Sequence, residues 1–155
     1  MICFHLSVLW GCRNDKVEAV LEQDLIEETK TSSGYSYYKN GTLLSPAAPS
    51  PHGNFKLRFN AQAQSVLDSS GKIPTGASFP EGSIIVKEVF DANAISLYVV
   101  MKKQASHELA ANSWLWFEFS PNGNVDYSIS KKGSDCVGCH SGNPNRDLTR
   151  SFDLH

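Results

Sequence analysis

The sequence lacks the features of two large classes of protein. No hydrophobic run approaches the roughly 20 residues that a membrane-spanning helix needs. No cluster of basic residues occurs, and 14 Lys and Arg against 16 Asp and Glu leave a formal net charge of −2, so nucleic acid is not an expected partner. No internal repeat is present. At 155 residues with 41% hydrophobic residues, the chain is expected to form one domain with a proper core, with or without a leader.

Cysteine is scarce, and two of the four cysteines stand in the pentapeptide Cys136-Val137-Gly138-Cys139-His140. This pentapeptide is typical of c-type haem attachment. Two thiols at this spacing can each add to one vinyl group of a porphyrin, and the next histidine can then bind the iron from one side. We therefore predict one covalent haem c per chain, held by Cys136 and Cys139, with His140 as the proximal iron ligand.

Three other uses of this cysteine pair fit the sequence less well. A thioredoxin-like redox pair belongs near a βαβ unit, whereas this pair lies between Gly133 and Pro144 in a segment typical of loops. A zinc site needs two further ligands at a short spacing, and Cys3 and Cys12 lie far upstream. A disulfide within the pentapeptide would be tight and would leave His140 without a role.

Residues 1–12 form a candidate truncated signal segment. They are mostly apolar and end in Leu9-Trp10-Gly11-Cys12, which resembles a lipoprotein processing box in which the cysteine is lipidated. Haem c is attached after export in bacteria, so a periplasmic or exported location is expected, with a lipid anchor at Cys12 as an open alternative. The segment lacks a basic start and is short for a signal peptide. The other interpretation is an apolar helix or strand that packs on the core.

The rest of the chain predicts an α+β fold, a mainly antiparallel β-sheet with helices on one side and a C-terminal haem-binding loop. An N-terminal helix is expected within 13–32, and Asn60 is expected to cap a second helix that Gly71 ends. Short strands joined by short turns imply pairing between neighbours. The expected helices cover 14–30 and 61–67, and the expected strands cover 34–44 (weakly), 55–59, 83–90, 95–103, 114–119 and 125–130.

Several motifs, in order along the chain, resemble the cytochrome P-460 family, which includes the cytochromes c-prime beta. His52-Gly53-Asn54 leads into a strand that ends at Phe59-Asn60. Residues 79–88 (Phe-Pro-Glu-Gly-Ser-Ile-Ile-Val-Lys-Glu) match a phenylalanine-proline-x-glycine strand. The remaining matches are the strand Leu97 to Lys102, the tryptophan strand from Asn112-Ser113-Trp114 to Trp116, and Cys136 to His140 followed by Asp147. The resemblance covers about 33–153 and assigns 33–155 to a haem c domain.

The resemblance implies a homodimer of small β-rich subunits, each with one high-spin, five-coordinate haem that is open on its distal side. Members of the family either oxidise hydroxylamine or bind nitric oxide. In the enzymatic members a lysine is bonded to the porphyrin edge, so an enzyme of this kind would resemble a hydroxylamine oxidoreductase. In the c-prime beta members that bond is absent, and phenylalanines cap the iron.

Four residues are candidates for contact with the distal side or the ring. Phe59 and Phe79 are the expected apolar caps. Lys72 is the nearest lysine to the second helix, and the expectation is an ordinary exposed turn residue. Lys87 shares a strand face with apolar neighbours, which is costly for an unpaired charge. Its side chain either lines the distal pocket or extends past the sheet edge so that the amine reaches water. We expect the second arrangement.

Two further functions stay open. A six-coordinate electron-transfer cytochrome would serve a redox partner protein and needs a sixth ligand, for which Met101, His52 and His107 are the options. Met101 faces the side expected to form the core, so filling the core is its simpler role. The third interpretation is a surface-anchored haem module of a larger oxidase or reductase, which would depend on the box at Cys12.

Overall fold

The computed structural model describes residues 11–47, 50–142 and 146–155 and confirms the α+β class. A six-stranded antiparallel sheet forms its centre. Within the described part of the chain, no helix has the length and apolar character needed to cross a membrane. The elements in chain order are α1 (Gly11–Lys30), β1 (Ser36–Tyr37), η1 (Tyr38–Gly41), β2 (Asn54–Phe59), α2 (Ala61–Gln64), β3 (Ile84–Asp91), β4 (Ala94–Lys103), β5 (Trp114–Phe119), β6 (Val125–Tyr127), η2 (Ile129–Lys131), α3 (Val137–His140) and α4 (Ser151–Leu154).

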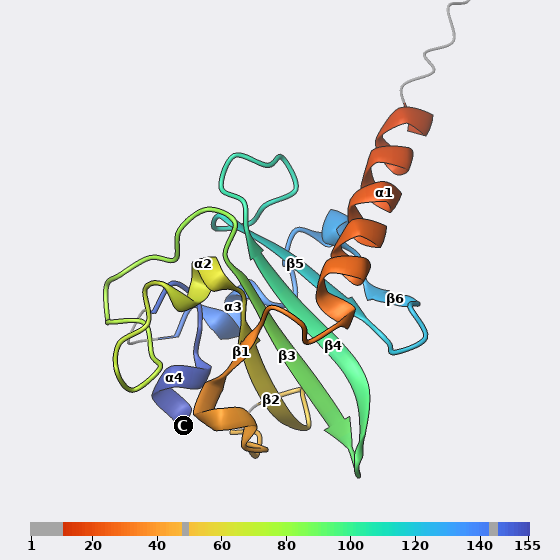
Figure 1. Cartoon of the computed structure of the whole chain (residues 1–155). Helices are drawn as coiled ribbons and strands as arrows, with labels where there is room; N and C mark the ends of the chain where they lie inside the picture. The colour runs from red at the N-terminus through yellow and green to blue at the C-terminus, as the bar shows by residue number, and fades with distance from the viewer. Residues whose placement is uncertain (1–10, 48–49, 143–145) are drawn as a thin grey trace, which may run out of the picture.

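The strands are hydrogen-bonded in the order in which they occur along the chain, from β1 to β6. Each strand therefore pairs with its sequence neighbours, as the short turns predicted. The β3–β4 hairpin turns at Ala92-Asn93, where Ala92 adopts a φ of 52°. This topology sets β3 and β4 in the middle of the sheet, away from either edge (Figure 1).

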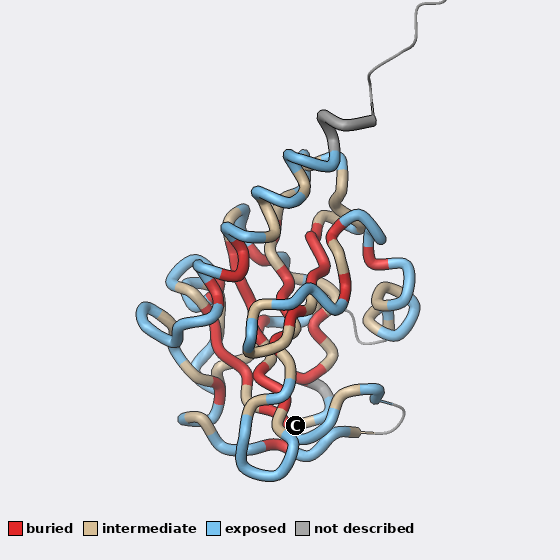
Figure 2. Tube along the Cα trace, turned by 90° about the vertical axis from the view of Figure 1, so that its right-hand side faces the viewer, coloured by how far each residue is buried: buried red, intermediate tan, exposed pale blue. Residues whose placement is uncertain are grey.

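The two faces of the sheet carry separate cores, because side chains alternate along each strand. Leu25 and Ile26 of α1 pack on one face, against Val86 and Phe117. The short helices pack on the other face, where Phe152 of α4 joins the second cluster. Helices thus cover both faces of the sheet, whereas the sequence had predicted them on one side. Figure 2 shows the buried strands between exposed outer turns.

A buried ion pair connects the end of α1 to the sheet. Arg58 is fully buried, and its Nε donates to Glu88 Oε1 at 2.7 Å. The guanidinium also donates to the main-chain oxygens of Thr29 and Thr31, and Tyr37 donates to the Glu88 carboxylate at 3.0 Å. Since a buried charge needs both a partner and hydrogen bonds, this network fixes where α1 ends against the sheet.

Three predicted elements are shorter in the structure. The strand predicted over 125–130 ends at Tyr127, and the turn η2 follows it. Asn60 does cap a helix, since its Oδ1 accepts from Ala63 N at 3.0 Å, but α2 ends at Gln64 and does not extend to 67. The Asp68 carboxylate accepts from the main-chain N–H of Ser70 and of Lys72, and this local turn competes with further helix. The strand predicted over 34–44 is reduced to β1, because the turn η1 follows with left-handed Lys39 and Asn40.

Candidate haem site

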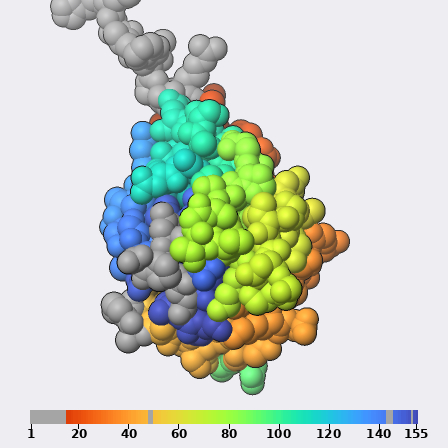
Figure 3. All heavy atoms as spheres, turned by 90° about the vertical axis from the view of Figure 1, so that its left-hand side faces the viewer, coloured from red at the N-terminus to blue at the C-terminus, as the bar shows by residue number. Residues whose placement is uncertain are grey.

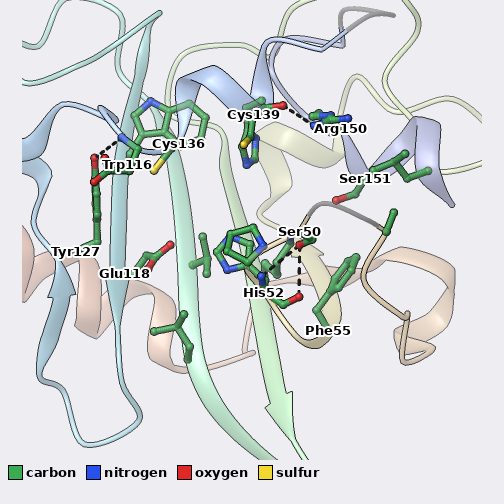
Figure 4. Close-up of a pocket in the computed structure, with 18 of the residues that line it drawn as sticks. Ser50, His52, Phe55, Trp116, Glu118, Tyr127, Cys136, Cys139, Arg150 and Ser151 are labelled. Atoms are coloured by element: carbon green, nitrogen blue, oxygen red, sulfur yellow. Dashed lines mark hydrogen bonds between the residues drawn. The ribbon is translucent and has the colours of Figure 1, made fainter.

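Cys136, Cys139 and His140 of the pentapeptide line one pocket of about 390 Å³ between the sheet and the C-terminal segments. In Figure 4, Cys136 and Cys139 lie at the top of this pocket and His52 and Phe55 at the bottom. The sheet forms one wall with Phe55, Lys87, Leu97, Val99, Trp116 and Glu118. The loop before β2 adds His52, and the C-terminal segments add Arg150, Ser151, Leu154 and His155.

The single turn of α3 brings the ligating groups together. Cys136 precedes the helix, and His140 N donates to Cys136 O at 3.0 Å. Residues three and four apart in a helix share a face, so both thiols and the imidazole serve the same pocket. Both cysteines are free thiols. Burial, with Glu118 nearby, raises the pKa of Cys136 to about 11, whereas redox-active Cys-x-x-Cys pairs lower it.

The ring of His140 is oriented by two contacts. Its Nδ1 lies 2.7 Å from Leu148 O, and a carbonyl oxygen can only accept, so Nδ1 carries the proton. The ring packs edge-on against Trp116, with 4.9 Å between centroids. Burial lowers the pKa of His140 to about 4, so the imidazole is neutral near pH 7. This tautomer leaves the lone pair on Nε2 available to a metal ion.

The sheet wall of the pocket suits a large, flat, mainly apolar group. Leu97 and Val99 on β4 are only half-buried there, whereas Tyr98 and Val100 on the opposite face are buried. A macrocycle in the pocket would cover these apolar side chains, and the two thiols and the free imidazole nitrogen are the donor set that haem c requires. The residues present therefore fit a covalently attached haem.

A family model described as "Cytochrome P460" matches residues 38–150. The chain belongs to the cytochrome P460 family. Membership implies a cytochrome with a haem cofactor, and the pentapeptide falls inside the matched range. A search of curated proteins found no match. Most residues that line the pocket fall inside the matched range, and Ser151, Leu154 and His155 follow it.

A lysine and a glutamate share the pocket wall of this cytochrome. The strand register aligns Lys87, Val99 and Glu118 across β3, β4 and β5. Burial lowers the pKa of Lys87 to about 8, against an opposing effect of Glu118, and burial raises the pKa of Glu118. Lys87 Nζ lies 4.5 Å from the centroid of the Phe55 ring. Lys87 thus lines the pocket and does not reach water past a sheet edge, because β3 is a central strand.

The other three sequence candidates lie outside the pocket lining. Lys72 Nζ donates to Phe152 O at 2.5 Å and caps the end of α4. Phe59 packs against the Phe152 ring at 5.8 Å, and Phe79 packs against the Trp114 ring at 5.6 Å. Figure 3 shows the C-terminal residues, in blue, against the segment that includes Lys72. Phe59 and Phe79 remain predictions as haem contacts, and Phe55 is the phenylalanine that the pocket itself presents.

Of the three alternative iron ligands, only His52 lies in the pocket. Met101 is buried in the core. His107 is in the loop after β4, where its Nδ1 accepts from Leu109 N at 3.1 Å. Two pocket residues, Glu118 and Arg150, were not predicted from the sequence. The alternation of β5 could have indicated Glu118, which shares the face of Trp116, but nothing local indicates that Arg150 donates to Cys139 O at 2.7 Å.

The environment of His52 predicts a pH-dependent stability. Burial and the nearby cationic Lys87 lower the pKa of His52 to about 4. Between that value and the ordinary 6.5, the unfolded chain binds more protons, so the free energy of unfolding falls as the pH falls through this window. The melting temperature of the natural protein should fall over that window. We expect the melting temperature of His52→Gln to fall by several degrees less. His107→Gln is the matched control, and equal losses in all three proteins would contradict the prediction.

Proposed function

We propose that this chain is an exported mono-haem c-type cytochrome whose iron binds or oxidises small nitrogen species such as nitric oxide or hydroxylamine. One haem c is attached per chain by thioethers to Cys136 and Cys139, with His140 as the one protein ligand to the iron. The observation that carries this proposal is the shared pocket, in which both thiols and the lone pair of a neutral imidazole face a mainly apolar wall. Met101, the only methionine of the described residues, is buried away from that pocket.

Three groups of pocket residues have distinct roles in this proposal. A bound haem supplies an iron that can bind a diatomic or accept electrons from a substrate. His140 holds the iron from one side, and Leu97, Val99 and Phe55 exclude water from the ring. Lys87 and Glu118 supply a proton donor and a carboxylate at the wall. Such polar groups favour a substrate with N–H and O–H bonds, as hydroxylamine has, over a purely apolar diatomic.

The optical spectrum of the reduced protein tests the open coordination site. We expect a high-spin, five-coordinate ferrous haem that binds nitric oxide. Addition of hydroxylamine with a chemical electron acceptor then separates the two activities, since steady turnover identifies an enzyme and tight nitric oxide binding without turnover identifies a sensor or scavenger. Sharp paired low-spin bands in the reduced natural protein would contradict the proposal.

Among the described residues, Lys87 is the lysine that lines the pocket. In the enzymatic branch that the sequence resembles, a lysine is bonded to the porphyrin edge. We expect Lys87→Gln to change the reduced optical spectrum and to lower any hydroxylamine oxidation by about 100-fold, the usual size of a proton-transfer contribution. Lys72→Gln is the matched control, because that amine donates to Phe152 O. The same spectrum and rate in both variants would remove Lys87 from the chemistry.

One observation favours a second candidate function. His52 lies in the same pocket as His140, and its lowered pKa keeps it neutral, so it is able to act as a sixth ligand in an electron-transfer cytochrome. Conversion of a low-spin natural spectrum to a high-spin one by His52→Ala would establish this alternative. A high-spin natural protein whose spectrum His52→Ala leaves unchanged would exclude it.

We further propose a periplasmic or exported homodimer that exchanges electrons with a redox partner protein. The support for export is the chemistry of haem c attachment. The lipid anchor depends on Cys12, which is the second residue of α1. Residues 1–10 lie outside the described part. Mass spectrometry of native protein tests the anchor, since acylation at Cys12 would support it and an intact, unacylated Met1 would remove it.

A further inference from the structure

Three motifs that are far apart in the sequence meet at the carboxylate of Asp147. Its Oδ2 accepts from Phe79 N at 2.8 Å, and its Oδ1 accepts from Trp114 Nε1 at 3.3 Å. Lys103 Nζ lies 2.8 and 2.9 Å from the two oxygens. The side chains of this ion pair are 10% and 11% exposed. A buried carboxylate with every oxygen engaged by donors holds its own main chain firmly in place.

The main chain held in this way leads directly to His140. Asp147 and Leu148 are consecutive non-glycine residues in the left-handed region, with φ of 50° and 67°. L-residues adopt this conformation only when their surroundings impose it. In this conformation the Leu148 carbonyl points at His140, and its oxygen accepts a hydrogen bond from Nδ1 at 2.7 Å. The neighbouring turn is closed by Thr149 N, which donates to Arg146 O at 3.0 Å.

We propose that Asp147, with Lys103, is a positioning residue that sets the electron donation of His140 to the haem iron. The inference rests on the proposed ligation of iron by His140. An acceptor at Nδ1 fixes the tautomer of a ligating histidine and increases its basicity. The Asp147 ion pair keeps that acceptor in place through Leu148, although neither side chain touches the imidazole. Stronger donation from His140 stabilises ferric iron and therefore lowers the reduction potential.

The test uses haem-loaded protein and two measurements that do not depend on activity. Asp147→Asn places an amide N–H₂ among the N–H donors of Phe79, Lys103 and Trp114, so the turn must shift and the Leu148 carbonyl must leave its place. We expect the iron–histidine stretch in the resonance Raman spectrum of the ferrous protein to move to lower frequency, and the midpoint potential to rise. Lys103→Gln removes the cation alone and is expected to move both values in the same direction.

The matched control is Glu88→Gln, which breaks the buried ion pair with Arg58 on the opposite face of the sheet. We expect this variant to lower the melting temperature without moving the stretch or the potential. An unchanged stretch and potential in haem-loaded Asp147→Asn and Lys103→Gln would overturn the inference, and so would failure of both to fold while Glu88→Gln folds. Failure of the natural protein to attach haem would instead overturn the proposed function, so the two failures are distinguishable.

Discussion

The Cys136→Ala/Cys139→Ala double variant is expected to lose all covalently bound haem. Each thiol lies in the pocket on or next to α3, and each forms one thioether in our proposal, so removal of both leaves no covalent link. Any haem that still binds should leave the protein in acidified organic solvent, and the intact mass should equal that of the bare chain. Each single variant should retain haem through the remaining thioether, with the band of its alkaline pyridine complex displaced toward longer wavelength.

The other two cysteines provide the control for this experiment. Cys3→Ala/Cys12→Ala removes the same number of thiols from outside the pentapeptide and should retain one covalent haem per chain. Full haem attachment in the Cys136→Ala/Cys139→Ala protein would show that the pocket does not bind haem through these cysteines.

Gly133→Ala is expected to cost about 3 kcal/mol of stability, because it combines overpacking with a strained backbone. Gly133 has a φ of +63°, and a methyl group there would lie 2.5 Å from Trp116 Cδ1 and 2.8 Å from its Nε1. The indole cannot easily retreat, since Nε1 donates to Ala111 O at 3.1 Å and the ring packs against His140. Denaturant unfolding should report the loss, and the haem spectrum should change with it.

Gly123→Ala separates the clash from the backbone effect. Gly123 also has a positive φ, +90°, but a methyl group there would meet nothing within 4 Å. We expect a cost of about 1 kcal/mol from the left-handed conformation alone and an unchanged haem spectrum. Equal costs for the two variants would contradict the contact between position 133 and Trp116.

Local patterns were sufficient to predict most of the sheet, and haem attachment at the pentapeptide stays a prediction. The aromatic strand 114–119 and the hairpin at Ala92-Asn93 are confirmed, because alternation and turn residues act between near neighbours. Helix 61–67 was too long because the Asp68 turn was not recognised. The cysteines were recognised from five adjacent residues, and the structure adds only their common pocket.

Contacts between distant parts of the chain could not be predicted in the same way. The pocket that Lys87 lines is completed by His52 and by C-terminal residues such as Arg150, which are distant from it in the sequence. The Asp147 carboxylate gathers donors from 33 to 68 residues away, and no local pattern marks them as partners. The same holds for His140, whose acceptor Leu148 is fixed by these distant contacts.

The intact mass of protein made with a working haem c maturation system, with the alkaline pyridine spectrum of the same sample, tests the central claim most directly. We predict the mass of the chain plus one haem, and a pyridine band characteristic of two thioether links. Colourless protein with the mass of the bare chain would contradict the account.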